Sequence, residues 1–224
     1  MKYILVLLFT GFISAETFKS WEANFEFTHF DYGKFKMQRQ FINEEGKITT
    51  GFKLRPLLIF EYSQKSSLVV RDNKVFSVET SVKNNVPGDH PKAFKVKFSG
   101  GQVSSEELNF LIKRKDRILD QLGSDVQMRI NAKNGVESYS LNVIDNDKGN
   151  IVSRQYQTIG SEVVETSFGS FDTIKVSATS PESSEIVYFL APDLDFFVIQ
   201  SYVQLKNGER NTLKIIDKPK FLEE

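Results

Sequence analysis

The sequence predicts a mainly β protein, an antiparallel meander of strands that is interrupted by one helix. Apolar and polar residues alternate with a period of two over most of the chain, and segments rich in Gly, Asn and Asp separate the alternating runs. The period changes to 3.6 after Gly101. Because the turns between neighbouring runs are short, we expect consecutive strands to pair antiparallel.

The first 15 residues have the composition of a secretory signal peptide. Lys2 precedes an apolar run that extends to Ile13, and the small residues Ser14 and Ala15 follow it. We expect cleavage after Ala15, which leaves residues 16–224 as a single, exported, periplasmic domain; an uncleaved, buried segment is the alternative. The apolar run is well short of the about 20 residues that cross a bilayer, so we expect no membrane-spanning helix.

Composition limits the partners and the chemistry. The sequence has no cysteine, which excludes the lipid-anchored cysteine of a bacterial lipoprotein, disulfides and thiolate metal sites. The formal net charge is zero, so we expect no nucleic-acid partner. Phenylalanine is frequent, with 20 residues, and its rings can fill a core or line an apolar pocket.

Strands of the first half follow from strict alternation. In residues 21–28, Trp21, Ala23, Phe25 and Phe27 share one face and polar residues the other. A turn at 31–33 leads to a return strand, a turn at 44–47 leads to a third strand, and Pro56 marks an edge or a break. The further strands that we expect cover residues 35–42, 48–54, 57–62, 68–71, 74–82 and 94–98, with a polar loop at 84–92.

One helix is expected from Asp116 to Asn134. Its apolar residues recur at helical spacing, and Gly135 can take the left-handed conformation that ends a helix. Ser104 and Glu107 have the spacing of a capping box. Gly123 inside the helix predicts a kink or close packing against a strand. The residues at helical spacing are Ile118, Leu119, Leu122, Val126 and Ile130.

The second half returns to the strand pattern, with strands expected at 136–144 and 151–157. The loop at 145–150 alternates Asp and Asn, but it lacks the length and the bidentate Glu of a calcium loop, so a hairpin turn is favoured. Residues 160–217 contain three more runs. The run at 186–190 is apolar on both faces, which predicts a central strand, and Gly169 and Asn207-Gly208 predict hairpin turns.

An ordered set of residues runs through positions 115–207: Asp116, Arg117, Gly135, Gly160, Glu162, Thr166, Gly169, Ala191, Pro192 and Asp193. With this set, residues 115–207 resemble the bacterial domain-of-unknown-function family 3108, which consists of exported envelope proteins. The resemblance implies an open or incompletely closed β-barrel with the central helix packed on its concave face, similar to lipoprotein-localisation carriers, and it implies no activity. This chain has Phe196-Phe197-Val198 where the family usually has a proline, so we expect a more regular strand there.

No residue pattern indicates catalysis. His29 and His90 are the two histidines, and the Gly-x-Ser-x-Gly motif of hydrolases is absent. Asp193 and Asp195 are two residues apart, but an Asp after Ala-Pro caps a turn more often than it serves as half of an acid–base pair. We therefore expect no enzymatic activity, no cofactor and no metal site.

Two functions remain open. In the first, the half-barrel binds or carries an apolar ligand, a lipid or an acyl chain, in a cavity of several hundred Å3. In the second, an envelope assembly or interaction protein has a filled core and no small-molecule ligand, and it binds an envelope protein through a sheet edge or an exposed Phe196-Phe197 patch. The residues expected to contact an apolar ligand are Phe25, Phe27, Phe35, Phe60, Phe76, Phe94, Phe98, Leu122 and Val126.

Overall fold

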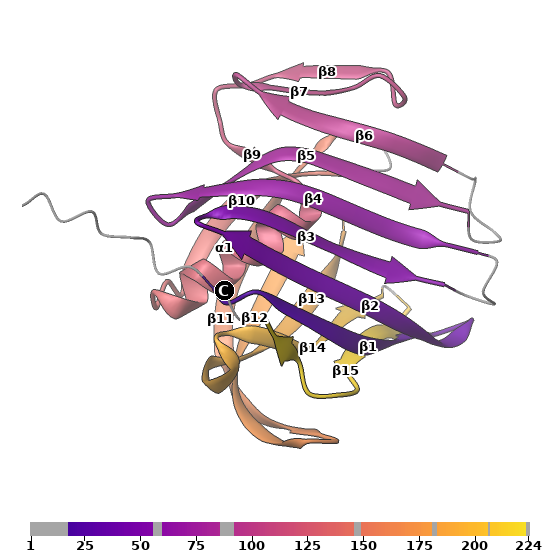
Figure 1. Cartoon of the computed structure of the whole chain (residues 1–224), viewed down its shortest axis with the longest axis vertical. Coiled ribbons are helices and arrows are strands. Elements are labelled where there is room, and N and C mark those ends of the chain that lie inside the picture. Colours follow the sequence, from indigo (N-terminus) through magenta and orange to yellow (C-terminus); the bar gives the residue numbers. More distant parts are fainter. Residues whose placement is uncertain are drawn as a thin grey trace, which may run out of the picture.

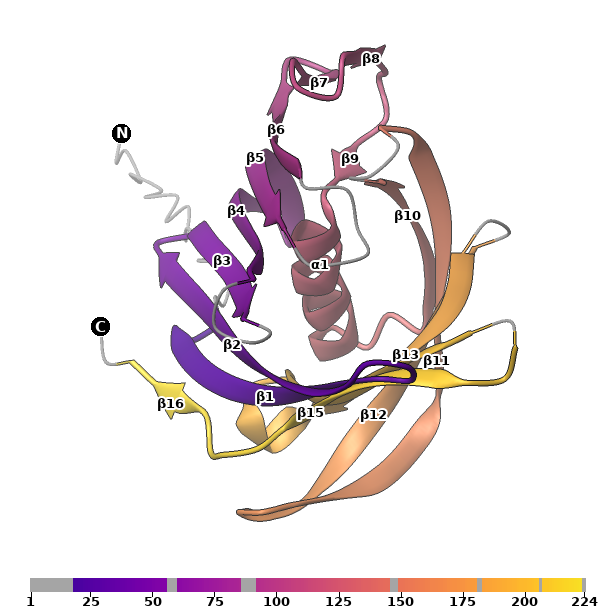
Figure 2. The ribbon, with the colours of Figure 1, turned by 90° about the vertical axis from the view of Figure 1, so that its right-hand side faces the viewer.

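The computed structural model describes residues 18–55, 60–85, 92–145, 149–180, 183–205 and 207–222. The expected signal peptide, Pro56, His90 and most of the polar loop around it lie outside these ranges. In the described part, strands form one curved sheet, and one α-helix, α1, lies inside the curve (Figures 1 and 2). This arrangement is the expected open barrel with a helix on its concave face.

The elements follow the chain in a meander, with a short 3-10 turn at Pro192–Leu194. The first strands are β1 (Trp21–His29), β2 (Gly33–Glu44), β3 (Lys47–Leu54), β4 (Tyr62–Arg71), β5 (Lys74–Asn84), β6 (Lys92–Ser99), β7 (Gln102–Ser105), β8 (Phe110–Lys113) and β9 (Ile118–Leu119). After α1 (Gln121–Lys133) come β10 (Ser138–Ile144), β11 (Ile151–Thr166), β12 (Gly169–Ser180), β13 (Ser183–Ala191), β14 (Phe197–Gln204), β15 (Arg210–Ile215) and β16 (Lys220–Phe221).

The sheet has two arms that meet at the first strand. One arm runs from β1 through β2 to β8, the other runs from β15 through β14 to β9, and β1 pairs with β15 between them. The short β16 extends the pairing along β1. Figure 2 shows α1 between the two arms, with β3 to β5 on one side and β10 and β11 on the other.

The two ends of the sheet, β8 and β9, are not hydrogen-bonded to each other. Instead, a small apolar cluster packs between the arms at this opening. Gly149, which has a φ of +65°, lies against Phe110 of β8 so closely that a Cβ atom would overlap the ring. Side chains rather than backbone hydrogen bonds therefore fill the opening of the barrel. The buried members of the cluster are Val82, Phe94, Val96, Val103, Ile118 and Ile144.

The helix starts five residues later than the sequence pattern predicts. It begins at Gln121 with Asp120 as its N-cap, whose side chain accepts a hydrogen bond from the Gly123 amide. Ile118 and Leu119 are extended instead, because they pair in parallel with Asn142 and Val143 of β10 and bury their side chains there. The prediction was wrong here because a strand pairing with a distant partner overrides local periodicity.

The expected capping box at Ser104 and Glu107 is also wrong. Ser104 belongs to β7, and the residues that follow turn back into β8. Instead, Ser105 accepts a hydrogen bond from the Leu108 amide at 3.2 Å, which stabilises this turn. The strand expected at 57–62 lies partly outside the described residues, and within them Phe60 and Glu61 precede the start of β4.

Local turn predictions are confirmed. Asp72 and Asn73 both have positive φ between β4 and β5, and Glu45 and Gly46 do so between β2 and β3. Gly123 packs closely, as expected, because a Cβ atom there would lie 2.8 Å from Ser77 Oγ and 3.2 Å from Leu68 Cδ2.

The corner between β13 and β14 is less regular than expected. Asp195 and Phe196 both adopt left-handed conformations, with φ of 58° and 56°. The register of β13 and β14 shifts a few residues away from this corner, between Phe189 and Leu190. Phe197 is only 1% exposed, because its ring packs edge-on against Trp21 and stacks near Phe25. The prediction of an exposed Phe196-Phe197 patch was therefore wrong.

Candidate functional site

The concave side of the sheet is filled by α1 and by the core side chains around it. A cavity of about 20 Å3 remains between β1, β2, β14 and α1. A single ordered water needs roughly 10–15 Å3, whereas ligand pockets measure several hundred Å3. Phe25, Leu122 and Val126 line this small cavity together.

The other residues expected to contact an apolar ligand lie apart from this cavity. Phe27 and Phe35 face each other across β1 and β2. Phe94 belongs to the apolar cluster at the opening of the barrel, and Phe98 packs against that cluster. Phe76 is 41% exposed on β5. Phe60 lies half-buried ahead of β4.

Residues of the family pattern occupy structural positions. Arg117 donates hydrogen bonds to the Val75 carbonyl at 2.9 Å and to Gln127 Oε1 at 2.6 Å, which joins β5 to α1. Asp116 is exposed just before β9, and Asp193 is exposed in the 3-10 turn, where Pro192 is the first residue and Ala191 is fully buried before it.

The remaining residues of the pattern shape turns and the long β11–β12 hairpin. Gly135 ends α1 with a φ of +68°, and Gly160, with a φ of +123°, lies at the bulge in β11. Glu162 forms an ion pair with Lys175 at 2.9 Å. At the hairpin tip, Thr166 Oγ1 donates a hydrogen bond to the carbonyl of Gly169 at 2.7 Å.

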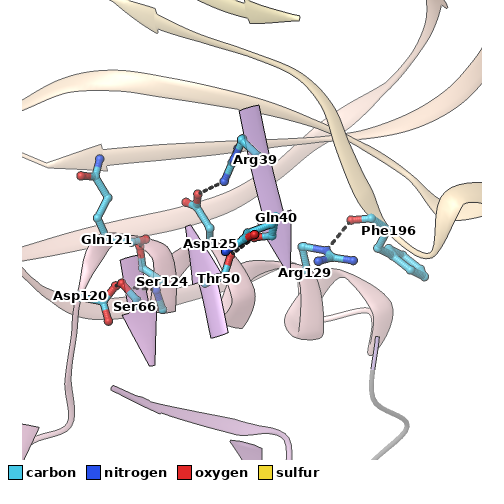
Figure 3. A network of polar contacts seen from close by, with 11 residues as sticks. Arg39, Gln40, Thr50, Ser66, Asp120, Gln121, Ser124, Asp125, Arg129 and Phe196 are labelled. Atoms are coloured by element: carbon cyan, nitrogen blue, oxygen red, sulfur yellow. Dashed lines mark hydrogen bonds and ion pairs between the residues drawn. The ribbon is translucent and has the colours of Figure 1, made fainter. Parts of the chain in front are cut away.

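Polar contacts that the sequence pattern did not predict hold α1 in the barrel. Asp120 is fully buried and accepts a hydrogen bond from Ser77 Oγ at 2.7 Å. It accepts a second hydrogen bond from Ser66 Oγ at 2.9 Å, and Figure 3 shows these two residues. Burial raises the pKa of the Asp120 carboxyl, and the hydrogen bonds from Ser77, the Gly123 amide and Ser66 oppose that rise.

The C-terminal half of α1 is fixed by Arg129. Its guanidinium donates hydrogen bonds to the carbonyls of Asp195 and Phe196, each at 3.0 Å, and lies 4.0 Å from the centre of the Phe18 ring. Burial lowers the pKa of Arg129 to about 10, so the side chain stays charged at neutral pH. Figure 3 shows the contact with Phe196.

Between these two anchors, Asp125 forms an ion pair with Arg39 of β2 at 3.4 Å. Burial raises the pKa of the Asp125 carboxyl, and the charges of Arg39 and Arg154 act in the opposite direction. Arg39 occupies an inward position between Met37 and Phe41 on β2. A charged residue at an inward position of an otherwise apolar strand face is the sequence feature that could have indicated this ion pair. These contacts fix the position of the helix against the sheet.

A second hollow, which we call the outer groove, lies on the opposite side of the sheet. It measures about 700 Å3 and extends over the outer face of β1 to β5, the face turned to the viewer in Figure 1. Its wall beside β1 comes from the segment after β15, where Asp217 Oδ2 accepts a hydrogen bond from Asn24 Nδ2 at 3.0 Å.

Strand register determines which side chains line the outer groove. Two rows of outward-facing residues run side by side across the five strands, from β1 to β5. The first row is Asn24, Gln38, Lys53, Ser63 and Lys83, and the second is Glu22, Gln40, Gly51, Lys65 and Ser81. All of these side chains are polar, and Gly51 leaves the middle of the second row without one.

Gly51 allows β3 and β4 to approach closely at the floor of the groove. A Cβ atom there would lie 2.7 Å from the Gln64 carbonyl oxygen, a backbone atom that cannot rotate away. We expect Gly51→Ala to lower the free energy of unfolding by about 1–3 kcal/mol, measured by urea denaturation. Gln40→Ala, a change at the exposed residue paired with Gly51, is the control and should stay within about 0.5 kcal/mol of the wild type. Equal stability of the two variants would contradict the close approach.

Neither a metal centre nor a membrane-spanning helix is found in the described part of the chain. No group of three or more His, Asp or Glu side chains is arranged to hold a metal ion there. No described helix has the length and apolar character needed to cross a bilayer.

Comparison with known proteins identifies a fold relative. No family model and no curated protein matches the sequence. Among solved structures, the chain is similar to a β-barrel-like protein of the domain of unknown function DUF1849 from Brucella abortus, with a TM-score of 0.58 and 14% sequence identity. The match covers 89% of this chain and 99% of the other. At this identity the similarity shows a shared β-barrel-like fold.

Proposed function

We propose that this chain is an exported, periplasmic envelope protein without enzymatic activity that binds its partner on its surface. The observation that carries the proposal is the filled half-barrel: within the described residues, α1 and the core side chains occupy the concave side of the sheet, and the cavity between α1, β1, β2 and β14 measures about 20 Å3. An acyl chain would have to displace α1 and break its contacts through Asp120, Asp125 and Arg129. Of the two functions considered above, the filled core favours the interaction protein over the carrier.

The compartment and the family belong to the same proposal. The apolar N-terminal run and the small residues at 14 and 15 support export. Membership of domain-of-unknown-function family 3108 is proposed on the sequence pattern in residues 115–207, and the β-barrel-like fold agrees with it without distinguishing this family from others of the same fold.

Mass spectrometry of the protein purified gently from the periplasm tests both parts. We expect an intact mass that corresponds to residues 16–224, and we expect an organic extract without a stoichiometric lipid or other apolar molecule, compared with a mock purification. The sample is also incubated with native envelope lipids before a second extraction. A stoichiometric apolar molecule in either extract would overturn the surface-binding proposal in favour of the carrier, and an intact N-terminus would overturn the proposed processing.

A further inference from the structure

The outer groove has the size of a ligand site, unlike the interior. Its volume of about 700 Å3 falls within the roughly 300–1,000 Å3 of known ligand pockets. Its floor is the regular backbone of β1 to β5, in which every strand is hydrogen-bonded to a neighbour on each side. The shape is therefore set by the sheet itself and does not depend on a loop.

Positive charge is concentrated in this groove, although the whole chain has a formal net charge of zero. Two acidic residues, Glu22 and Asp217, line it along with the lysines. The carboxylate of Glu61, beside the groove, lies 3.1 Å from the ammonium of Lys53 and 4.0 Å from that of Lys83, and neutralises part of the charge. The lysines that line the groove are Lys53, Lys65, Lys83, Lys218 and Lys220.

The lysines are spread across the groove and do not form one cluster. Lys53 and Lys83 belong to one cross-strand row, Lys65 to the other, and Lys218 and Lys220 to the wall beside β1. A ligand that reaches from the β1 wall to β5 therefore meets cations at both ends and in the middle. This distribution suits several separated negative charges better than a single one.

The remaining outward side chains are amides and hydroxyls. Asn24, Gln38 and Gln40 each offer both donors and acceptors, and Ser63 and Ser81 add hydroxyls. Such groups pair with the hydroxyls of a sugar. The two rows carry no outward aromatic or aliphatic side chain to anchor a peptide, and these five strands present no free edge for an added strand.

We propose that the outer groove binds an anionic saccharide, a short sugar chain that carries several carboxylate or phosphate groups. The lysines bind the negative groups, and the amides and serines bind the hydroxyls. Gly51 has no side chain, so a sugar ring can lie closer to the backbone of β3 and β4 there. This inference rests on the proposed surface-binding function and names the class of partner.

Binding of a defined probe tests the inference. The mature protein is titrated with tetragalacturonate, and maltotetraose of equal length serves as the neutral comparison. We expect saturable binding of tetragalacturonate that weakens as sodium chloride is raised, and no binding of maltotetraose. Amide resonances of Gln40, Gly51 and Lys65 should shift in the wild-type protein, which locates the site without any substitution.

Matched variants test the role of the lysines. Lys65→Gln and Lys53→Gln should each weaken binding about tenfold. Lys34→Gln is the control, because Lys34 lies on the same face of β2, outside the groove, and is 67% exposed. It should bind like the wild type. Thermal midpoints confirm that each variant is folded.

Several outcomes would overturn the inference. These are the absence of saturable binding, equal binding of maltotetraose, resonance shifts confined to residues outside the groove, or equal weakening by Lys34→Gln. Tighter binding of hexaglutamate with the same dependence on Lys65 would identify an acidic-peptide site instead. An apolar molecule in the organic extract together with Lys65-dependent tetragalacturonate binding would reject the surface-only function and still support the groove.

Discussion

Replacing Arg129 by methionine is expected to lower the free energy of unfolding by about 3–5 kcal/mol. Arg129 is 4% exposed and supplies the donors for two carbonyls, those of Asp195 and Phe196, at the corner between β13 and β14. Both of these residues have left-handed backbone conformations that cost energy for non-glycine residues. Without the guanidinium, two carbonyls lose their partner and the corner loses the contact that holds it.

Urea denaturation of the wild type and variants measures this loss. Lys133→Met is the control, because Lys133 lies one turn further along α1 and pairs with Asp195 at 3.6 Å while 27% exposed. It should cost at most about 1 kcal/mol. Arg129→Lys should recover only a small part of the stability that Arg129→Met loses, since an ammonium cannot reproduce the planar geometry of two parallel donors. A loss below about 1 kcal/mol for Arg129→Met would show that the corner does not depend on this contact.

Asp120→Ala is the second large expected effect, a loss of about 2–4 kcal/mol. An N-cap contributes about 1 kcal/mol, and the hydroxyls of Ser66 and Ser77 lose their acceptor in a fully buried position, which costs about 1–3 kcal/mol more. Asp116→Ala is the matched control, because Asp116 is exposed ahead of β9 and should stay within about 0.5 kcal/mol. If the Asp116 variant lost more than the Asp120 variant, the helix would begin where the sequence pattern placed it.

The pH dependence of the same comparison gives an independent check. Burial raises the folded-state pKa of Asp120 above its usual value of 3.8, so the folded protein takes up a proton at a higher pH than the unfolded chain. The contribution of this carboxyl to stability therefore rises as the pH falls through the folded pKa towards 3.8. As the pH falls over that window, the difference in the free energy of unfolding between the wild type and Asp120→Ala should grow. A difference that shrinks would contradict the burial of the Asp120 carboxyl.

Local signals explain why the meander could be predicted from the sequence. Turns such as Asp72-Asn73 depend on a few neighbouring residues, and the two-sided apolar run of β13 reflects burial on both faces, with Val187 and Phe189 as buried as Tyr188 and Leu190. Such features are determined by residues within one short segment, so the sequence of that segment predicts them.

Features that depend on distant partners could not be read in this way. The extended Ile118-Leu119 pair needs β10, which follows the helix, and helical spacing was misleading for these residues. The outer groove needs the register of five strands together with the small size of Gly51. From one strand at a time, Gln40 and Lys65 are ordinary solvent-facing residues.

The pairing of β1 with β15 also sets the order in which the molecule can be assembled. Asn24 and Asp217 lie 193 positions apart in the chain and meet at this seam. The two arms can each form from neighbouring hairpins, but they join only after almost the whole polypeptide is present. Contacts this distant slow folding, so a chain still emerging from the ribosome remains an unjoined pair of β-meanders.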